Sequence, residues 1–276
     1  MKSIVELRKE KGVLVAAHRG MSAGNIPPNS IAAFEIALRD GADILEMDLF
    51  KSLDGEIFVF HTGMEPSHLD RHIHIEEYTA EEIRNMKLCN CDLTQTYLPV
   101  NSFDDVLEHL KGRCKLNLDR SIKIIDSVME VVKRHGMEDQ ILMKSDPSDD
   151  SLKRIEAYAP NVDYMPIFMQ EDTASEKIEK MHINYVGAEL VFAKETAPVI
   201  QESYLEMQKK KGRILWGNAI LYSSRVPLTA GHTDDVSLVD DPKKGWGWLA
   251  DKGFDIIQTD WGRHCVEYLK ENNYRK

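Results

Sequence analysis

Residues 42–61 read ADILEMDLFKSLDGEIFVFH, and this stretch decides the fold class. Ala42–Phe50 is rich in apolar residues and predicts a buried strand, and Glu56–His61 predicts a second strand after it. Asp54-Gly55 lies between them, and this dipeptide is a strong signal for a tight hairpin turn because both residues tolerate a positive φ. The stretch is therefore a strand with an antiparallel hairpin partner.

The first of these strands carries two carboxylates on one face. Glu46 and Asp48 are two residues apart, so both side chains point to the same side together with Ile44, whereas Leu45 and Met47 point to the other side. Two carboxylates that face a barrel interior repel each other and lose hydration. A bound divalent cation relieves both effects, and oxygen ligands suit Mg²⁺ or Ca²⁺. A salt-bridge network with Lys or Arg is the alternative.

Outward from this stretch, the chain alternates strands with helices. Further strands are expected at Val13–Ala17, Cys114–Leu118, Gln140–Met143, Val162–Pro166, Tyr185–Leu190, Arg213–Gly217 and Asp255–Gln258. Helices are expected at Ser30–Arg39, Ala80–Met86, Phe103–Leu110, Ile122–His135, Ser151–Tyr158, Ala174–Met181, Ala197–Lys209, Trp246–Lys252 and Cys265–Lys270. With the hairpin strand set aside, eight strand–helix units predict an α/β fold, a (β/α)8 TIM barrel that forms one domain over residues 1–276. A doubly wound open sheet is the alternative, but no glycine-rich dinucleotide turn follows the first strand.

Two insertions interrupt the repeat. Residues 62–112 form an excursion after the second strand, and residues 219–245 form a long loop after the seventh. Loops of this length in compact domains are usually lids or disordered segments, so we expect a lid at 219–245. Asn29 follows two prolines and is expected to cap the helix that begins at Ser30.

Composition restricts the class of partner. The 276 residues are 42% hydrophobic, and 35 basic against 46 acidic residues give a net charge of −11. That charge repels nucleic acids and anionic lipid, so a phosphate site needs local cations or a metal. The N-terminal MKSIVELRKEKG lacks the apolar stretch of a secretory signal, and no run approaches 18 apolar residues. We therefore expect a cytoplasmic protein without a membrane span, and its four cysteines are expected to be reduced thiols.

Function in a TIM barrel lies at the carboxyl ends of the strands. His18 and His61 each end an apolar strand, unlike the histidines in helices and excursions, His68 included, which are expected to be solvated. Two histidines beside a phosphate can divide the proton transfers, one as base and one as acid. Asp119 ends the next strand and adds a third oxygen ligand to Glu46 and Asp48.

Other polar residues also stand near strand ends. Lys144 offers a cation for a phosphate, and Glu189 is expected either to pair with Lys144 or to ligate. Trp216 is more often a core residue in general, but at a barrel rim it is positioned to stack on the face of a bound substrate.

The order and spacing of these residues resemble a known family. The matching motifs are Ala17-His18-Arg19-Gly20, Pro28-Asn29-Ser30, Ala33-Phe34, Gly41-Ala42-Asp43, Glu46-Met47-Asp48, Asp54-Gly55, His61, Trp216-Gly217-Asn218 and the run from Gly253 to Asp260. Together they resemble the glycerophosphodiester phosphodiesterase family. The resemblance is dense over residues 13–61, lighter over 98–144, and returns over 213–270.

The resemblance implies a role for each matching residue. It implies His18 and His61 as the acid/base pair, Arg19 as a phosphate contact, and Glu46 and Asp48 as metal ligands. Three positions depart from the family pattern: Asp119 stands where a glutamate ligand is usual, Ser121 where lysine is frequent, and Thr62 follows His61 where aspartate is usual. Lys144 is a candidate for the missing cation.

The expected function is metal-dependent hydrolysis of a small glycerophosphodiester to an alcohol and glycerol phosphate, a reaction of lipid and glycerol metabolism. The cofactor is Mg²⁺ or Ca²⁺. The alternatives are a phospholipase-like relative that acts on another phosphodiester and a non-catalytic barrel that binds a phosphorylated polyol. The presence of both histidines and both carboxylates argues against the binding barrel. The leaving alcohol and the oligomeric state stay open.

Overall fold

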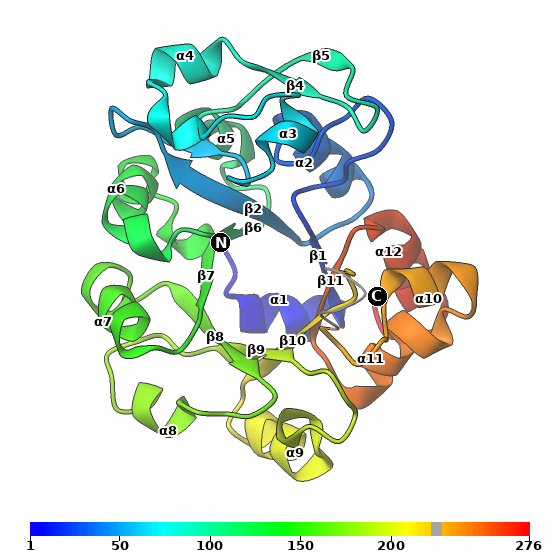
Figure 1. The fold of residues 1–276 in the computed structure, drawn as a ribbon. Coiled ribbons are helices and arrows are strands. Elements are labelled where there is room, and N and C mark those ends of the chain that lie inside the picture. The colour runs from blue at the N-terminus through cyan, green and yellow to red at the C-terminus, as the bar shows by residue number, and fades with distance from the viewer. Residues whose placement is uncertain (222–227) are drawn as a thin grey trace.

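Eight parallel strands close into a barrel in the computed structural model, which describes residues 1–221 and 228–276 (Figure 1). The strands are β1 (Leu14–Ala17), β2 (Ile44–Lys51), β6 (Lys115–Asp119), β7 (Ile141–Ser145), β8 (Asp163–Met169), β9 (Gly187–Val191), β10 (Ile214–Asn218) and β11 (Ile256–Thr259). Their order is β1-β11-β10-β9-β8-β7-β6-β2, and pairing of β1 with β2 closes the ring. The predicted TIM barrel is confirmed, and the open sheet is excluded.

Helices surround the barrel on its outside (Figure 1). They are α2 (Ile31–Arg39), α5 (Phe103–Leu110), α6 (Ile125–His135), α7 (Asp149–Tyr158), α8 (Ser175–Ile178), α9 (Glu202–Lys210), α11 (Trp248–Lys252) and α12 (Gly262–Glu271). The prediction that Asn29 caps α2 is wrong: the side chain of Ser30 accepts from Ala33 N. Across the described ranges, every helix is too short or too polar to traverse a lipid bilayer.

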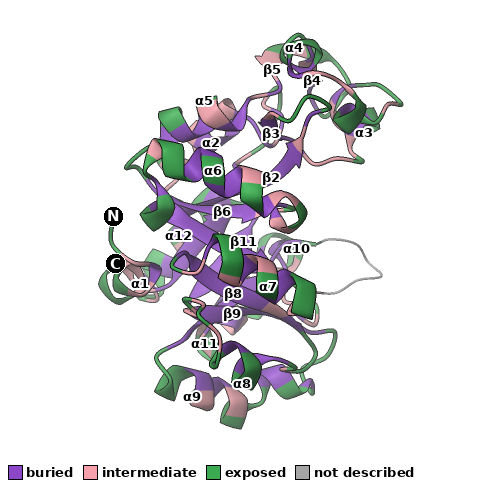
Figure 2. Ribbon diagram, turned by 90° about the vertical axis from the view of Figure 1, so that its left-hand side faces the viewer, coloured by how far each residue is buried: buried purple, intermediate pink, exposed green. Residues whose placement is uncertain are grey.

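The strands separate two apolar layers, as the alternation of β2 predicts. Leu45 and Met47 belong to the large core between strands and helices, whereas Ile44 lies inside the barrel, together with residues such as Leu14 and Trp216. Figure 2 shows the strands almost entirely buried and the outer faces of the helices exposed. Alternation along each strand thus directs one set of side chains toward the barrel axis.

One short helix, α1 (Ile4–Lys11), closes the amino end of the barrel and was not predicted. Ser3 and Glu6 form a capping box at its start. Ile4 is 0% exposed and packs with the residues inside the barrel. Arg8 Nε donates to Asp255 Oδ1 at 2.7 Å, and Lys11 Nζ donates to Asp43 Oδ1 at 2.7 Å, so ion pairs attach α1 to the barrel.

The excursion after β2 folds over its own small core. The hairpin strand β3 (Ile57–Val59) leads into the excursion, which contains α3 (Glu65–His68), α4 (Ala80–Arg84), β4 (Lys87–Cys89) and β5 (Gln95–Pro99). β3 pairs antiparallel with β2, as the Asp54-Gly55 turn predicts, and β4 pairs with β5 in a separate hairpin. Phe50, Phe58 and Phe60 are buried in this second core.

The segment after β10 differs from the expected structureless loop. It contains α10 (Asp234–Val239) and a π-helical turn (Lys243–Gly247) that leads directly into α11. Thr229 Oγ1 donates to Asn218 O at 2.8 Å, so the segment is joined to the end of β10. Part of the predicted lid, residues 222–227, lies outside the described residues.

The burial of α1 at the amino end of the barrel gives a stability prediction. Ile4→Ala removes side-chain volume from the barrel interior and is expected to lower the free energy of unfolding by about 2–5 kcal/mol. Denaturant unfolding measures this change. Lys9→Ala on the exposed face of the same helix is the control and is expected to stay near wild type. Equal stability of the two variants would show that α1 does not close the barrel.

Candidate functional site

Three carboxylates converge at the carboxyl end of the barrel. Glu46 and Asp48 of β2 lie opposite Asn117 and Asp119 of β6 in the parallel register. Oxygens of Glu46, Asp48 and Asp119 lie within 4.8 Å of one another, and the first two residues are each only 2% exposed. The three side chains predicted as metal ligands are therefore brought together.

Each carboxylate has one oxygen fixed by a neighbouring N–H group. The donor–acceptor pairs are Arg19 N to Glu46 Oε2, Asn29 Nδ2 to Asp48 Oδ2, and Arg120 N to Asp119 Oδ1, each at 2.8 Å. No donor from residues 1–221 or 228–276 reaches the other oxygen of each group. One oxygen of every carboxylate is therefore fixed in place while its partner oxygen is left for a ligand.

The donors reach these oxygens through an uncommon backbone conformation. Arg19, Asn29 and Arg120 have φ values of 55°, 56° and 56°, in the left-handed region that non-glycine residues rarely adopt. Such strain is concentrated at functional sites, where surrounding contacts hold it. In Arg19 and Arg120 it coincides with backbone N–H groups that point at carboxylates. Asn29 uses its side chain instead: Nδ2 donates to Asp48 Oδ2, and Oδ1 accepts from Asp48 N at 3.1 Å, so this side chain is engaged here and not in capping α2.

The cluster carries more negative charge than its surroundings balance. Burial, together with the charges of Asp48 and Asp119, raises the pKa of Glu46 to about 8 against the opposing effects of His18 and Lys144. Arg19 Nε lies 3.0 Å from Asp48 Oδ2 and is a nearby cation. A site of three oxygen donors with excess negative charge fits a hard divalent cation.

His18 follows β1 and lies beside the cluster. Its Nδ1 is 2.8 Å from Asp260 Oδ1, at the end of β11. Burial opposes protonation of His18, but the Asp260 hydrogen bond and the Glu46 charge outweigh it and raise its pKa.

His61 follows the hairpin strand β3 and has the opposite electrostatic environment. Its Nδ1 donates to Thr62 O at 3.0 Å, and its Nε2 lies 3.4 Å from Arg120 Nη1. Burial lowers the pKa of His61, and the charges of Arg19 and Arg120 add to this against the effect of Asp48. The two histidines are therefore shifted in opposite directions.

Lys144 and Trp216 form a buried network on the other side of the barrel. Lys144 Nζ lies 2.6 Å from Glu189 Oε2 and 3.8 Å from the centroid of the Trp216 ring. Trp216 Nε1 donates to Asn218 Oδ1 at 3.0 Å and to Gln258 Oε1 at 3.1 Å. Of the two roles open for Glu189, the structure favours ion pairing. Trp216 is 0% exposed, so the expectation that it lies at the rim is wrong: it packs against the Lys144 ammonium inside the barrel.

A groove of about 430 Å³ opens beside His18 and Arg19. The other residues that line it are Met21, Ser22, Ala23, Pro28, Met64, His68, Asp260 and Trp261. His68 was expected to be solvated, but its ring lies edge-on to Phe60 at 6.3 Å, and burial lowers its pKa. The groove provides space for a ligand larger than phosphate.

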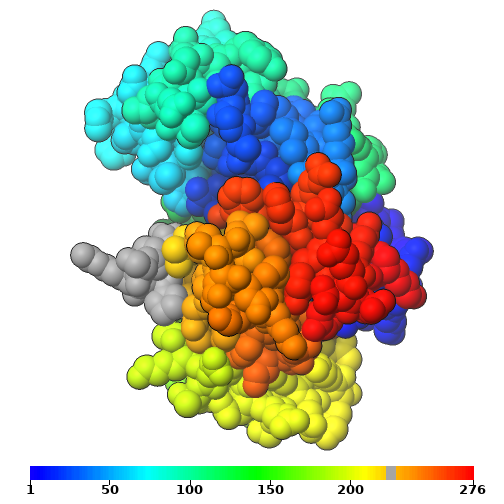
Figure 3. Space-filling view, turned by 90° about the vertical axis from the view of Figure 1, so that its right-hand side faces the viewer, coloured from blue at the N-terminus to red at the C-terminus, as the bar shows by residue number. Residues whose placement is uncertain are grey.

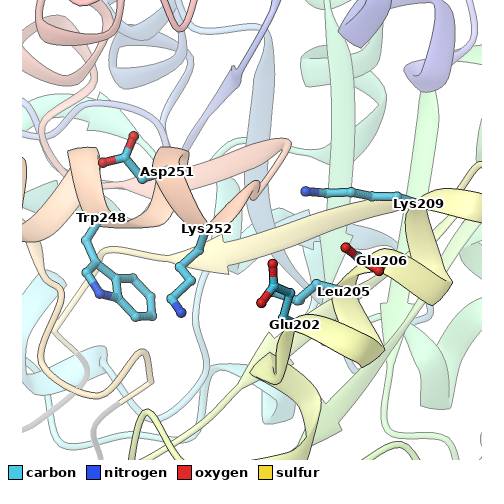
Figure 4. A pocket seen from close by; sticks show the side chains of 7 residues that line it. All are labelled: Glu202, Leu205, Glu206, Lys209, Trp248, Asp251 and Lys252. Atoms are coloured by element: carbon cyan, nitrogen blue, oxygen red, sulfur yellow. The ribbon is translucent and has the colours of Figure 1, made fainter.

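A second groove, of about 420 Å³, lies outside the barrel between α9 and α11. Figure 4 shows Trp248 and Lys252 facing the space in front of Glu202, whereas Asp251 points away. It contains none of the residues that converge at the strand ends, so the candidate site is the one beside His18.

Four residues of the site were not assigned a role in it from the sequence, although one of them was expected to cap a helix: Asn29, His68, Arg120 and Asp260. Asp260 had a usable signal because it ends the last strand, where a barrel places functional groups. His68 had none, since nothing local indicates that α3 folds back over the barrel end.

Proteins with similar sequences include glycerophosphodiester phosphodiesterases. A glycerophosphodiester phosphodiesterase from Bacillus altitudinis is 28% identical over 140 residues, which cover 48% of this chain and 57% of that protein. The chain thus matches less than two thirds of this curated relative's length. A second family model, described as a domain of unknown function, matches residues 164–269.

Solved structures share the fold. A glycerophosphoryl diester phosphodiesterase from Parabacteroides distasonis has a TM-score of 0.77 at 17% identity, covering 99% of this chain and 93% of that chain. An Oleispira antarctica phosphodiesterase, solved in complex with the product sn-glycerol-3-phosphate, has a TM-score of 0.69 at 19% identity, covering 94% and 97%.

The model of the glycerophosphoryl diester phosphodiesterase family matches residues 18–216, most of the 276-residue chain, and so includes both histidines and all three carboxylates. The chain belongs to the glycerophosphoryl diester phosphodiesterase family.

Proposed function

We propose that this protein hydrolyses glycerophosphodiesters to an alcohol and glycerol phosphate in a metal-dependent reaction. The observation that carries the proposal is the convergence of Glu46, Asp48 and Asp119 within 4.8 Å beside two histidines with opposite pKa shifts. Family membership supports the same reaction class, and the Oleispira relative binds the product that this reaction releases.

Glu46, Asp48 and Asp119 would hold the divalent metal, Mg²⁺ or Ca²⁺, which when bound supplies positive charge that polarises the phosphoryl oxygens. Arg19 and Arg120 flank the carboxylates and are assigned as phosphate contacts. Lys144 is already paired with Glu189, so its contribution is a buried positive charge rather than direct contact.

The two histidines divide the proton transfers. The raised pKa of His18 favours its protonated form, and the lowered pKa of His61 favours its neutral form. Titratable groups whose pKa values are pushed apart in one site are suited to opposite roles. We therefore assign His61 as the base and His18 as the acid in the first step.

The nucleophile is assigned to the substrate itself. The glycerol 2-hydroxyl attacks phosphorus while His61 takes its proton, and His18 donates a proton to the oxygen of the departing alcohol. Water then opens the cyclic phosphate with the roles reversed. An attached hydroxyl has a high effective molarity compared with free water, which favours this route over direct hydrolysis.

The groove beside His18 favours a second candidate. Met21, Met64 and Trp261 line it, and Trp261 is 46% exposed, so an apolar leaving group would fit there. A related barrel phosphodiesterase with a phospholipase-like substrate is therefore the alternative. A panel of glycerophosphodiesters and lysophospholipids, assayed with Mg²⁺, with Ca²⁺ and with chelator, separates the two.

The carboxylate cluster predicts metal dependence. Chelation is expected to abolish hydrolysis. Removing a residue that only hydrogen-bonds to a metal ligand typically lowers activity about 10–100-fold, and Glu46→Gln, which removes a proposed ligand itself, is expected to lower activity by more than this. Because the pKa of Glu46 is raised to about 8, its carboxyl group is mostly protonated at neutral pH without metal, and the amide of Glu46→Gln resembles that neutral form. Glu46→Gln is therefore expected to melt no lower than metal-free wild type. Turnover with and without metal, together with thermal melts, measures both effects.

Glu76→Gln in the exposed part of the excursion removes the same charge and serves as the control. Full activity of wild type in excess chelator would rule out the metal site.

The histidine assignment predicts two losses that differ with the substrate. His18→Ala and His61→Ala are each expected to lower turnover by about two to four orders of magnitude. With a nitrophenyl leaving group, which departs without protonation, the loss in His18→Ala should shrink while that in His61→Ala should persist. The rate of leaving-group release in a single turnover, which reports the first step before the roles reverse, gives the comparison on both substrates, with exposed His74→Ala as control. A loss of equal size on both substrates would contradict the assignment of His18 as the acid.

The internal nucleophile predicts a requirement for the 2-hydroxyl. A substrate that lacks only this hydroxyl is expected to bind but to turn over far more slowly, since water must replace an attached nucleophile. Turnover at saturating concentration is the measurement. Hydrolysis as fast as that of the parent compound would identify water as the attacking group.

A further inference from the structure

A buried carboxylate lies in the part of the chain beyond the family match, which ends at residue 216. Asp234, the first residue of α10, is 3% exposed. Its Oδ1 accepts from Trp246 Nε1 and from Thr259 Oγ1, each at 2.6 Å, and its Oδ2 accepts from the backbone N of Asp260 at 2.8 Å. Asp234 therefore binds the last residue of β11 through one oxygen and the first residue of the following loop through the other.

That loop carries the partner of His18. Asp260 Oδ1 lies 2.8 Å from His18 Nδ1, and His18 N donates to Thr259 O at 3.2 Å. An ionised carboxylate only accepts hydrogen bonds, so Nδ1 carries the hydrogen and Nε2 is left to exchange a proton with the substrate. Asp260 thus selects the ring atom that reacts.

We propose that Asp234 and Asp260 are positioning residues for the acid/base function of His18. Asp234 fixes the backbone at Asp260, and the Asp260 carboxylate orients the imidazole and stabilises its protonated form. The segment after β10, expected to be a lid, then acts as a support for the catalytic histidine. Figure 3 shows the orange and red C-terminal segments, which include α10 and α12, packed against the blue N-terminal part of the chain.

This proposal rests on the proposed function, because it assumes that His18 exchanges a proton in hydrolysis. A purely structural role would predict a different pattern: Asp234→Asn would lower the melting temperature, and kcat of the folded protein would not change. A positioning role predicts a fall in kcat at unchanged KM, since substrate binding does not depend on the tautomer of His18.

The test compares Asp260→Asn, Asp234→Asn and the double variant, with Asp235→Asn as the control. Asp235 is the exposed neighbour of Asp234 on α10, so the control removes the same charge. Asp260→Asn and Asp234→Asn are each expected to lower kcat about 10–100-fold, as loss of a partner that orients a reactive group does, with KM unchanged. The double variant should lose no more kcat than Asp260→Asn alone, because Asp234 acts through Asp260.

A spectroscopic measurement follows His18 directly. In ¹⁵N NMR spectra of the full chain, recorded at a pH high enough to leave the ring neutral, His18 should be the Nδ1–H tautomer in wild type and in Asp235→Asn. Its ring-nitrogen shifts should change in Asp260→Asn and in Asp234→Asn. Where Asp234→Asn does not fold, Trp246→Phe takes its place, since it removes one of the donors that hold Asp234.

The outcomes separate the two proposals. A wild-type protein that hydrolyses glycerophosphodiesters, together with an Asp260→Asn variant of unchanged kcat, would overturn the positioning role and leave the function standing. Additive losses in the double variant would overturn the action of Asp234 through Asp260. If wild type hydrolyses none of these substrates, the proposed function fails. If in addition the ring-nitrogen shifts of His18 do not change in Asp260→Asn, the proposed contact between Asp260 and His18 is overturned as well.

Discussion

The mutual repulsion of three closely spaced carboxylates, two of them buried, is the constraint on which the candidate site depends. Glu46, Asp48 and Asp119 are brought together by the register of β2 and β6, and this register is fixed by the apolar side chains that alternate with them. Hydrophobic packing between the strands and the helices therefore holds the three carboxylates close together on the inner face of the barrel. The left-handed residues Arg19 and Arg120 partly offset that charge with their backbone N–H groups, and the divalent cation that we propose for this site would complete the balance.

The sequence predicted what depends on periodicity and strand ends. Alternation in 42–61 placed Ile44, Glu46 and Asp48 on the inner face, and the repeat of strands and helices predicted the closed barrel. The convergence of the three carboxylates followed, because parallel strand ends meet at one end of a barrel. These features depend only on residues close together in the chain and on general rules of topology.

The remaining features depend on contacts between distant segments. The helix α1 has a weak amphipathic pattern of its own, and only its burial against the barrel explains it. Trp216 was assigned to the rim because sequence does not say how deep a strand-end side chain lies. The partnership of Asp234 with Asp260 joins residues on two segments whose proximity requires the finished fold.

The ion pairs of Asp43 affect how the two ends of the chain unfold locally. Its fully buried side chain accepts from Lys11 Nζ at 2.7 Å and from Arg275 Nη2 at 3.0 Å, so one carboxylate links the two ends of the chain at the base of the barrel. Neither end can fray without uncovering a charge that the other end also neutralises. We therefore expect amide hydrogen exchange at α1 and at the C-terminal residues to be coupled, so that loosening one end makes the other a starting point for proteolysis.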